Sequence, residues 1–217
     1  MKIVSMTLPA DKFYNEICEK TQIALHHSVS DPKSPSGDVN SYRTNPNHIA
    51  TPYIIGYDGT ITKTFPSNCW ANHLGVKAEF LRSKGIKNFG QQNQILNKQS
   101  IAIELDAWGG LTCDVKGNYV NAYGKLIAED LEVVNIPHRG YEYFQKYSAK
   151  QIAALEELLK ELMSYYKIPS YGIKDGNFGV RMDALEGTAG IFSHTSFRAD
   201  KSDLYPDPDL IQMLNRL

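Results

Sequence analysis

Three segments of the chain carry side chains whose chemistry is hard to explain by packing alone. His26 lies near the end of a mainly apolar run at residues 22–28, His194 follows the short apolar run 190–193, and Asp203 lies nine residues further on. A catalytic zinc ion needs three nitrogen, oxygen or sulfur ligands and one open position for water. Two neutral imidazoles and one carboxylate would leave a positively charged site, in which a bound water becomes acidic enough to react near neutral pH.

Two further charged residues fit the same chemistry. Glu104 lies inside the apolar run 100–105, where a carboxylate is costly unless it faces a site or a partner. Facing such a water, it would accept the proton. Lys201, two residues before Asp203, would place an ammonium group where it stabilises the oxyanion of a hydrolysed carbonyl. Taken singly, each histidine could be a buried structural residue and each charged residue part of a solvated surface. Only the combination favours a metal-dependent hydrolase.

Four runs of β-branched and aliphatic residues predict the strands of a sheet. Asp58-Gly59 stands between two of them, and this dipeptide is a hairpin signal because glycine tolerates the positive φ of a tight turn. Residues 31–38 are polar and rich in serine and proline, which predicts a loop. The run around Glu104 is typical of a strand buried inside a sheet. The predicted strands are residues 22–28, 53–57, 60–65 and 100–105.

Helical spacing of apolar residues is clearest in residues 149–166. Ser148 and Gln151 form a capping-box pattern at the start of this segment. A weaker helix is predicted near 76–84, and a short one after Pro208. These helices, alternating with the strands, provide the crossover connections of an α/β fold.

Composition and charge narrow the class of protein. The 217 residues are 42% hydrophobic and 22% charged, which predicts a single α/β domain over 1–217, with a mixed central β-sheet flanked by α-helices. The net charge of −1 argues against a nucleic-acid partner, and no apolar run approaches the ~20 residues of a membrane span. The N-terminus lacks the apolar core of a signal peptide, so we expect synthesis in the cytoplasm. Three scattered cysteines predict reduced thiols: Cys18, Cys69 and Cys113.

Five segments, in order along the chain, resemble the N-acetylmuramoyl-L-alanine amidases of the type-2 amidase and peptidoglycan-recognition-protein superfamily, which includes the phage amidase lysozymes. Residues 23–28 (IALHHS) resemble the strand with the first metal ligand, and 53–61 (YIIGYDGTI) the family's hairpin. Residues 70–75 (WANHLG) resemble a substrate loop, and 100–105 (SIAIEL) the strand with the catalytic glutamate. The segment 193–203 is similar to the closing motif in which a histidine precedes Lys-Thr-Asp.

The resemblance implies a role for each matching residue and one Zn²⁺ ion per chain. Two neighbours compete with the implied ligands: His27 follows the first histidine directly, and Asp200 precedes the aspartate of the Lys-Ser-Asp pattern. The alignment favours His26 over His27 and Asp203 over Asp200. The implied residues are His26, His194 and Asp203 as zinc ligands, Glu104 and Lys201 in catalysis, and His73, Trp70, Asn72 and Tyr53 along the substrate groove.

Two departures from the family pattern affect these expectations. Some members have a tyrosine or histidine just before the second strand, where Thr51 and Pro52 stand here. We therefore expect no tyrosine-assisted mechanism, so that a larger share of the catalysis falls to Glu104. Residues 112–147 have no counterpart in the pattern, so we predict that they are an insertion containing an extra hairpin around 117–120.

The implied activity is zinc-dependent hydrolysis of the amide between N-acetylmuramic acid and L-alanine in peptidoglycan. We expect a phage or prophage endolysin, made in the cytoplasm and acting on the cell wall after release. One alternative is a cytoplasmic amidase that recycles muropeptides. Another is a non-catalytic peptidoglycan receptor of the same fold, although such receptors generally lack part of the zinc triad, which is complete here.

Overall fold

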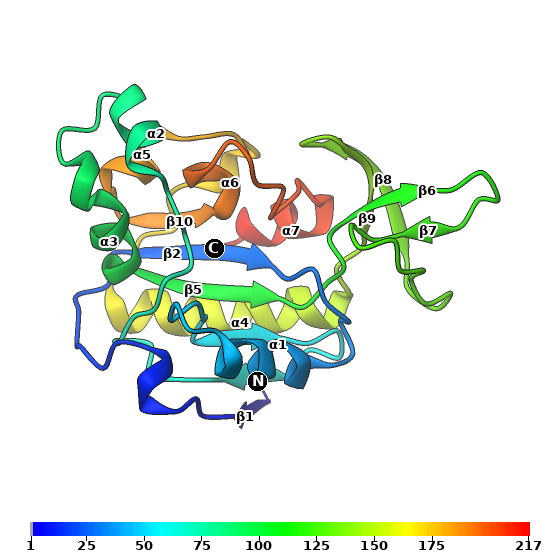
Figure 1. The fold of residues 1–217 in the computed structure, drawn as a ribbon, viewed down its shortest axis with the longest axis horizontal. Coiled ribbons are helices and arrows are strands. Elements are labelled where there is room, and N and C mark those ends of the chain that lie inside the picture. The colour runs from blue at the N-terminus through cyan, green and yellow to red at the C-terminus, as the bar shows by residue number, and fades with distance from the viewer. Residues whose placement is uncertain (1) are drawn as a thin grey trace.

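The computed structural model describes residues 2–217 and is built around a six-stranded mixed sheet (Figure 1). The strand order is β1-β4-β3-β5-β2-β10. All neighbouring pairs are parallel except β3 and β4, which form the antiparallel hairpin. The strands are β1 (Ile3–Ser5), β2 (Gln22–His27), β3 (Tyr53–Ile55), β4 (Ile61–Lys63), β5 (Ser100–Leu105) and β10 (Gly190–Ser193).

Helices cover both faces of this sheet. The long helix α4 packs on one face together with α7, and their apolar residues join the odd-numbered residues of β2 and β5 in the main core. Helices α1, α2 and α3 lie on the opposite face, where smaller clusters contain Ala24 and Ile54. The helices are α1 (Pro35–Thr44), α2 (Ala78–Ser83), α3 (Phe89–Gln99), α4 (Ala149–Tyr166), α5 (Met182–Glu186), α6 (His194–Phe197) and α7 (Pro208–Leu214), with short 3-10 turns at Ala10–Lys12 and Ile173–Asp175.

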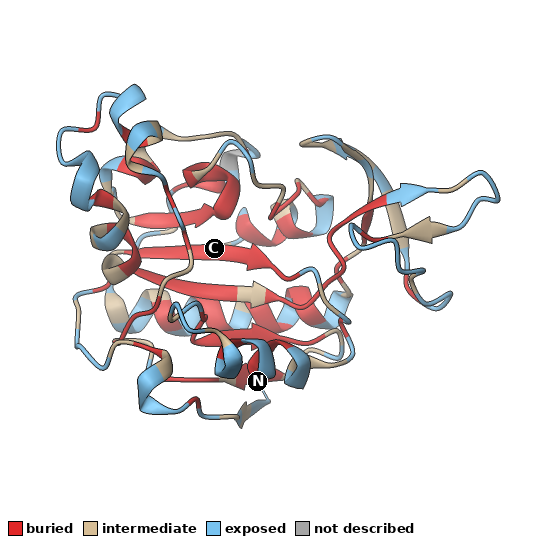
Figure 2. Cartoon of the chain, in the orientation of Figure 1, coloured by how far each residue is buried: buried red, intermediate tan, exposed pale blue. Residues whose placement is uncertain are grey.

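A second sheet of four strands projects from the body of the molecule, beyond the carboxyl end of β5 (Figure 1). We call it the arm. Much of its surface is exposed or half-buried, in contrast with the buried central strands (Figure 2). At its base, Trp108, Leu111 and Leu131 form a small apolar cluster of their own. The strand order is β7-β6-β9-β8, with β6 at Gly110–Cys113, β7 at Tyr119–Val120, β8 at Val133–His138 and β9 at Tyr141–Gln145.

The predicted α/β fold is confirmed, and most of the predicted elements are present. Gly59 has a φ of 80° in the hairpin turn, and Ser148 caps α4 in a complete capping box with Gln151. The loop predicted at 31–38 is wrong in part, because α1 begins at Pro35. None of the helices in residues 2–217 combines the length and apolar character needed to cross a membrane.

Helix α1 forms despite a sequence of low helix propensity, PSGDVNSYRT. Pro35 stands at its first position, where a missing N–H costs nothing and the fixed φ suits a helix. Val39 is fully buried and Tyr42 nearly so, both against the strand that contains Ile54. Tertiary packing of these side chains therefore stabilises a helix that local preference would not form.

Candidate active site

The alternation of side chains along β2 and β5 separates the two adjacent histidines. His26 stands opposite Glu104 in the parallel register, and both lie near the carboxyl ends of their strands. Because successive residues point to opposite faces, His27 points to the α4 face. Its Nδ1 lies 2.7 Å from the hydroxyl oxygen of Tyr147. The structure therefore directs His26, and not His27, to the face where Glu104 lies.

His26, His194 and Asp203 converge on one point. Nδ1 of His26 lies 3.1 Å from Nδ1 of His194, and Oδ2 of Asp203 lies 2.9 Å from the second nitrogen and 3.3 Å from the first. A tetrahedral ion with bonds of about 2.0–2.1 Å keeps its ligand atoms about 3.3–3.4 Å apart. The three atoms therefore already have nearly the separation that a zinc ion imposes.

The hydrogen bonds around this cluster are those expected of a metal-binding site. Nε2 of His194 lies 2.8 Å from the carbonyl oxygen of Leu74, and a carbonyl can only accept, so this nitrogen carries the proton. In the neutral ring, Nδ1 is then a bare lone pair that faces a carboxylate oxygen and another imidazole nitrogen. Such a set repels itself unless a proton or a metal ion lies between its members. A ring whose second nitrogen is held by a backbone carbonyl is also the usual arrangement of a metal-binding histidine.

The ionisation of the cluster favours metal binding. Burial, with the nearby His194 adding to its effect, lowers the pKa of His26 to about 4, so the ring is neutral and a lone pair is available. Burial alone would raise the pKa of Asp203, but His194 and His26 outweigh it and hold this pKa well below the ordinary value. Two neutral imidazoles and one carboxylate are the ligand set that suits zinc with an open position.

A cavity of about 470 Å³ opens onto this cluster. Glu104 and Lys201 line it, so the structure brings both predicted catalytic residues to the three candidate ligands. Burial raises the pKa of Glu104 to about 8, and the neighbouring Asp38 adds to this effect. A pKa in this range suits a residue that takes and returns a proton near neutral pH. The exposed Tyr123 reaches the same cavity from the arm.

Comparison with known proteins identifies the family. The sequence profile of N-acetylmuramoyl-L-alanine amidase matches residues 19–205, which is most of the chain. The chain belongs to this amidase family. No curated protein matches it.

Solved structures share the fold of this amidase at low sequence identity. PlyL is 15% identical, with a TM-score of 0.50, and the match covers 99% of this chain and 97% of that one. The catalytic domain of XlyA is 14% identical, with a TM-score of 0.51 and coverage of 94% and 90%. The hydrolase AmiA of Staphylococcus aureus, solved with its ligand, is 12% identical, with a TM-score of 0.51 and coverage of 99% and 81%.

The predicted substrate residues of the amidase do not all lie at the cavity. His73 lines it, and its ring nitrogens lie 3.1 Å from Nε2 of His26 and 2.9 Å from Oγ of Ser100. Burial holds the pKa of His73 well below its usual value, with the two neighbouring histidines adding to the effect, so this ring is neutral. Of the four predicted residues, only His73 is placed beside the candidate metal ligands.

Trp70 stacks on Tyr14 with ring centroids 3.9 Å apart, and its indole N–H donates to Glu16. Its ring is buried and does not line the cavity. The structure therefore gives Trp70 a place in packing, not in the predicted groove.

Tyr53 and Asn72 also lie outside the cavity lining. Tyr53 is an odd-numbered strand residue and packs in the core on the α4 face. The amide of Asn72 donates to the backbone oxygen of Asn47, so it supports the loop that leads to His73. For both residues, the local backbone of the strand or loop decides where the side chain points. The residue types of the motif do not show this direction.

Asp200, the competing carboxylate, lies elsewhere. It accepts two hydrogen bonds from the guanidinium group of Arg198, at 2.9 and 2.6 Å, and is exposed. This pairing lowers the pKa of Asp200 to about 2. The arrangement leaves Asp203 as the carboxylate that joins the two histidines.

Tyr42 is a site residue that the sequence did not indicate. It comes from α1, lines the cavity, and its hydroxyl donates to Oε2 of Glu104 at 2.5 Å. The same hydroxyl lies 3.0 Å from Oγ1 of Thr51. Residues 51 and 52 supply no tyrosine, but the structure places the hydroxyl of Tyr42 beside Glu104 from another part of the chain. The missed signal was helix α1 itself, since its residues were assigned to a loop or left unassigned.

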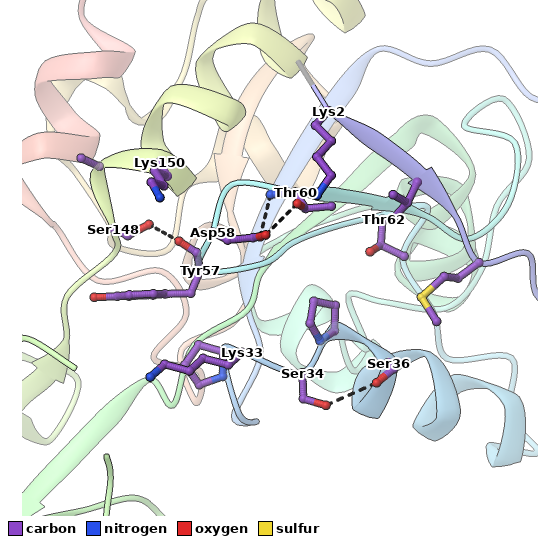
Figure 3. Close-up of a pocket in the computed structure, with 15 residues that line it drawn as sticks. Lys2, Lys33, Ser34, Ser36, Tyr57, Asp58, Thr60, Thr62, Ser148 and Lys150 are labelled. Atoms are coloured by element: carbon purple, nitrogen blue, oxygen red, sulfur yellow. Dashed lines mark hydrogen bonds between the residues drawn. The ribbon is translucent and has the colours of Figure 1, made fainter. Parts of the chain in front are cut away.

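A larger cavity, of about 790 Å³, lies between the start of α1, the β3–β4 hairpin and the start of α4 (Figure 3). Lysines stand around it, and Asp58 is held by the backbone and hydroxyl of Thr60. Its lining within residues 2–217 contains no histidine and no cysteine. The groups suited to hydrolysis therefore belong to the smaller cavity.

A buried pair of carboxyl groups, Asp38 and Asp106, lies beside the active-site cavity. Ser30 bonds to both, at 3.0 and 2.8 Å, and Ser28 bonds to Asp106 at 2.9 Å. Burial raises the pKa of Asp106 to about 8, with Asp38 adding to the effect, and burial also raises the pKa of Asp38. The pair therefore stabilises the folded protein best when one of its carboxyl groups is protonated.

This pair makes stability depend on pH. A carboxyl whose pKa is raised on folding contributes stability that is complete below about pH 4 and is lost as the pH rises towards 8. Asp38→Asn removes one of the two charges, so at pH 8 we expect it to raise the melting temperature by about 2–4 °C, equivalent to about 1 kcal/mol. Thermal unfolding at pH 4.5 is the control, where variant and wild type should differ little. A variant less stable than wild type at pH 8 would contradict this interpretation.

Proposed function

We propose that this chain is a zinc-dependent N-acetylmuramoyl-L-alanine amidase that hydrolyses the amide between the lactyl group of N-acetylmuramic acid and L-alanine. One observation carries the proposal: three acceptor atoms, on His26, His194 and Asp203, converge on a point in the cavity that Glu104 and Lys201 also line. This combination supplies a metal site, a base and a cation within one opening. Family membership supports peptidoglycan as the substrate.

Each of these residues has a defined task in amide hydrolysis. His26, His194 and Asp203 would hold the zinc ion, which when bound makes a water molecule acidic and polarises the carbonyl group. Glu104 accepts the proton of the attacking water and passes it to the leaving amine. Lys201 places its ammonium group towards the developing oxyanion and stabilises it.

We further propose that the enzyme works as a phage or prophage endolysin, with a cytoplasmic recycling amidase as the alternative. The two settings differ in substrate: an endolysin must cut intact, cross-linked wall, whereas a recycling enzyme needs only soluble fragments. A non-catalytic receptor needs none of the acid–base groups found here, and the presence of Glu104 and Lys201 in the cavity therefore supports the enzyme.

Mass spectrometry of digested sacculi tests the proposed bond. We expect free stem peptides that begin with an unmodified L-alanine amine, together with glycan strands that retain intact lactyl groups. Products cut between two amino acids or between two sugars would refute the assignment. Parallel digestion of purified soluble muropeptides separates the two settings, because an endolysin should release peptides from intact sacculi at a comparable rate.

A further inference from the structure

Helix α1 contacts the carboxyl end of β5 at two points. Tyr42 donates to Glu104, and Asp38, one helical turn earlier, shares Ser30 with Asp106. Four residues of helix rise by about 6 Å, and two residues of extended chain by about 6.6 Å. The spacing of Asp38 and Tyr42 along the helix therefore matches the spacing of Asp106 and Glu104 along the chain, with the helix antiparallel to the strand.

The first of these contacts determines how Glu104 is presented. A carboxylate has two oxygens, and the Tyr42 hydroxyl donates to Oε2. No other side-chain hydrogen bond holds Glu104 within residues 2–217, so its second oxygen is left for a water or substrate in the cavity. From these contacts we propose that Tyr42 is a positioning residue, which fixes the carboxylate of Glu104 in one orientation for proton transfer. This inference rests on the proposed role of Glu104 as the base.

Thr51 extends the contact into a chain of hydroxyl groups. Tyr42 has one hydroxyl proton, and it is given to Glu104. The single hydroxyl proton of Thr51 has two acceptors within reach, the Tyr42 hydroxyl at 3.0 Å and the backbone oxygen of Tyr53 at 3.1 Å. Both side chains are buried, with exposed fractions of 4% for Thr51 and 9% for Tyr42. When Thr51 donates to Tyr42, a chain runs from Thr51 through Tyr42 to Glu104 and polarises the last hydrogen bond towards the carboxylate.

The second contact keeps the helix in place. The half-buried Ser30 hydrogen-bonds to the buried carboxyl groups of Asp38 and Asp106, and Asp106 lies two residues beyond Glu104 in the chain. A helix anchored at this point cannot slide along the strand without breaking these hydrogen bonds. The hydroxyl of Tyr42 is thereby held at a fixed height above Glu104, which a side chain on a free loop would not achieve.

Tyr42→Phe tests the proposal, because it removes the hydroxyl and keeps the ring that packs in the core. We expect kcat for stem-peptide release to fall roughly 10-fold, the factor that corresponds to loss of one charged hydrogen bond. KM, bound zinc and melting temperature should stay near the wild-type values. Tyr166→Phe is the matched control, since its hydroxyl bonds to Ser67 outside the cavity lining, and it should leave kcat unchanged.

A second variant and a structure complete the test. Thr51→Val should lower kcat by a smaller factor than Tyr42→Phe, and adding it to Tyr42→Phe should cause no further loss, because it acts through the tyrosine. A crystal structure of Tyr42→Phe should show the Glu104 carboxylate rotated or in two orientations. Unchanged kcat, a loss confined to KM or zinc content, or an unmoved Glu104 would each overturn the proposal. If wild type and Tyr166→Phe release no stem peptides, the proposed function fails instead, and the Glu104 orientation still decides the role of Tyr42.

Discussion

Replacing His194 by alanine is expected to abolish both metal binding and amide hydrolysis. The ring supplies one of three atoms that lie 2.9–3.3 Å apart around a single point, and its loss leaves only two protein ligands. Zinc sites with three protein ligands lose most of their affinity when one is removed, since each ligand contributes a bond to the ion. We expect bound zinc to fall from one ion per chain to nearly none, and stem-peptide release to fall at least about 10³-fold.

His27→Asn provides a matched control within the same strand. His27 is as deeply buried as His26, but its Nδ1 faces Tyr147 on the other side of the sheet. Asparagine places a polar atom near that position, so the fold should persist and zinc content should stay at one ion per chain. Removing zinc from the wild type with a chelator should reproduce the inactivity of His194→Ala. Adding zinc should restore activity to the chelated wild type and not to His194→Ala. Full activity in a verified metal-free sample would refute the mechanism.

The central strands and the candidate ligands could be predicted because their signals are local. A short, nearly continuous apolar run defines β2 and β5, and a charged or imidazole group within such a run stands out by its cost of burial. Glu104 was recognised in this way. The choice of His26 over His27 needed the resemblance, and the structure supplies the physical reason, since the two rings point to opposite faces of the sheet.

The parts that could not be predicted depend on contacts between distant segments. The serine, glycine and asparagine residues of α1 favour a loop locally, and the helix forms only when Val39 and Tyr42 pack against the sheet. The contact between Tyr42 and Glu104 joins residues 62 positions apart, which no local spacing shows. Trp70 shows the converse: a motif resemblance indicated a groove residue, whereas stacking on Tyr14 places the ring elsewhere. The insertion proposed for 112–147 corresponds to most of the arm and stays a prediction.

Glu104→Gln is expected to retain zinc and lose turnover, which separates binding of the ion from proton transfer. Glutamine has the same shape, and its carbonyl oxygen can still accept the hydrogen bond from Tyr42, so neither the fold nor the ligands should change. What the variant lacks is a group able to take a proton from water and return it to the leaving amine. General acid–base catalysis contributes about 10²–10⁴-fold, and we expect kcat to fall by that factor with KM little changed.

The pH dependence of the residual activity gives this prediction a second readout. In the wild type, ionisation of a group with a pKa of about 8 in the free protein should produce activity that rises with pH, because only the ionised carboxylate accepts the proton. A bound zinc ion would favour the ionised form and shift this limb to lower pH. In Glu104→Gln the limb should vanish, whereas Glu161→Gln, an exposed substitution on α4, should retain it. If Glu104→Gln kept wild-type turnover and the same pH profile, the base would have to be another residue of the cavity.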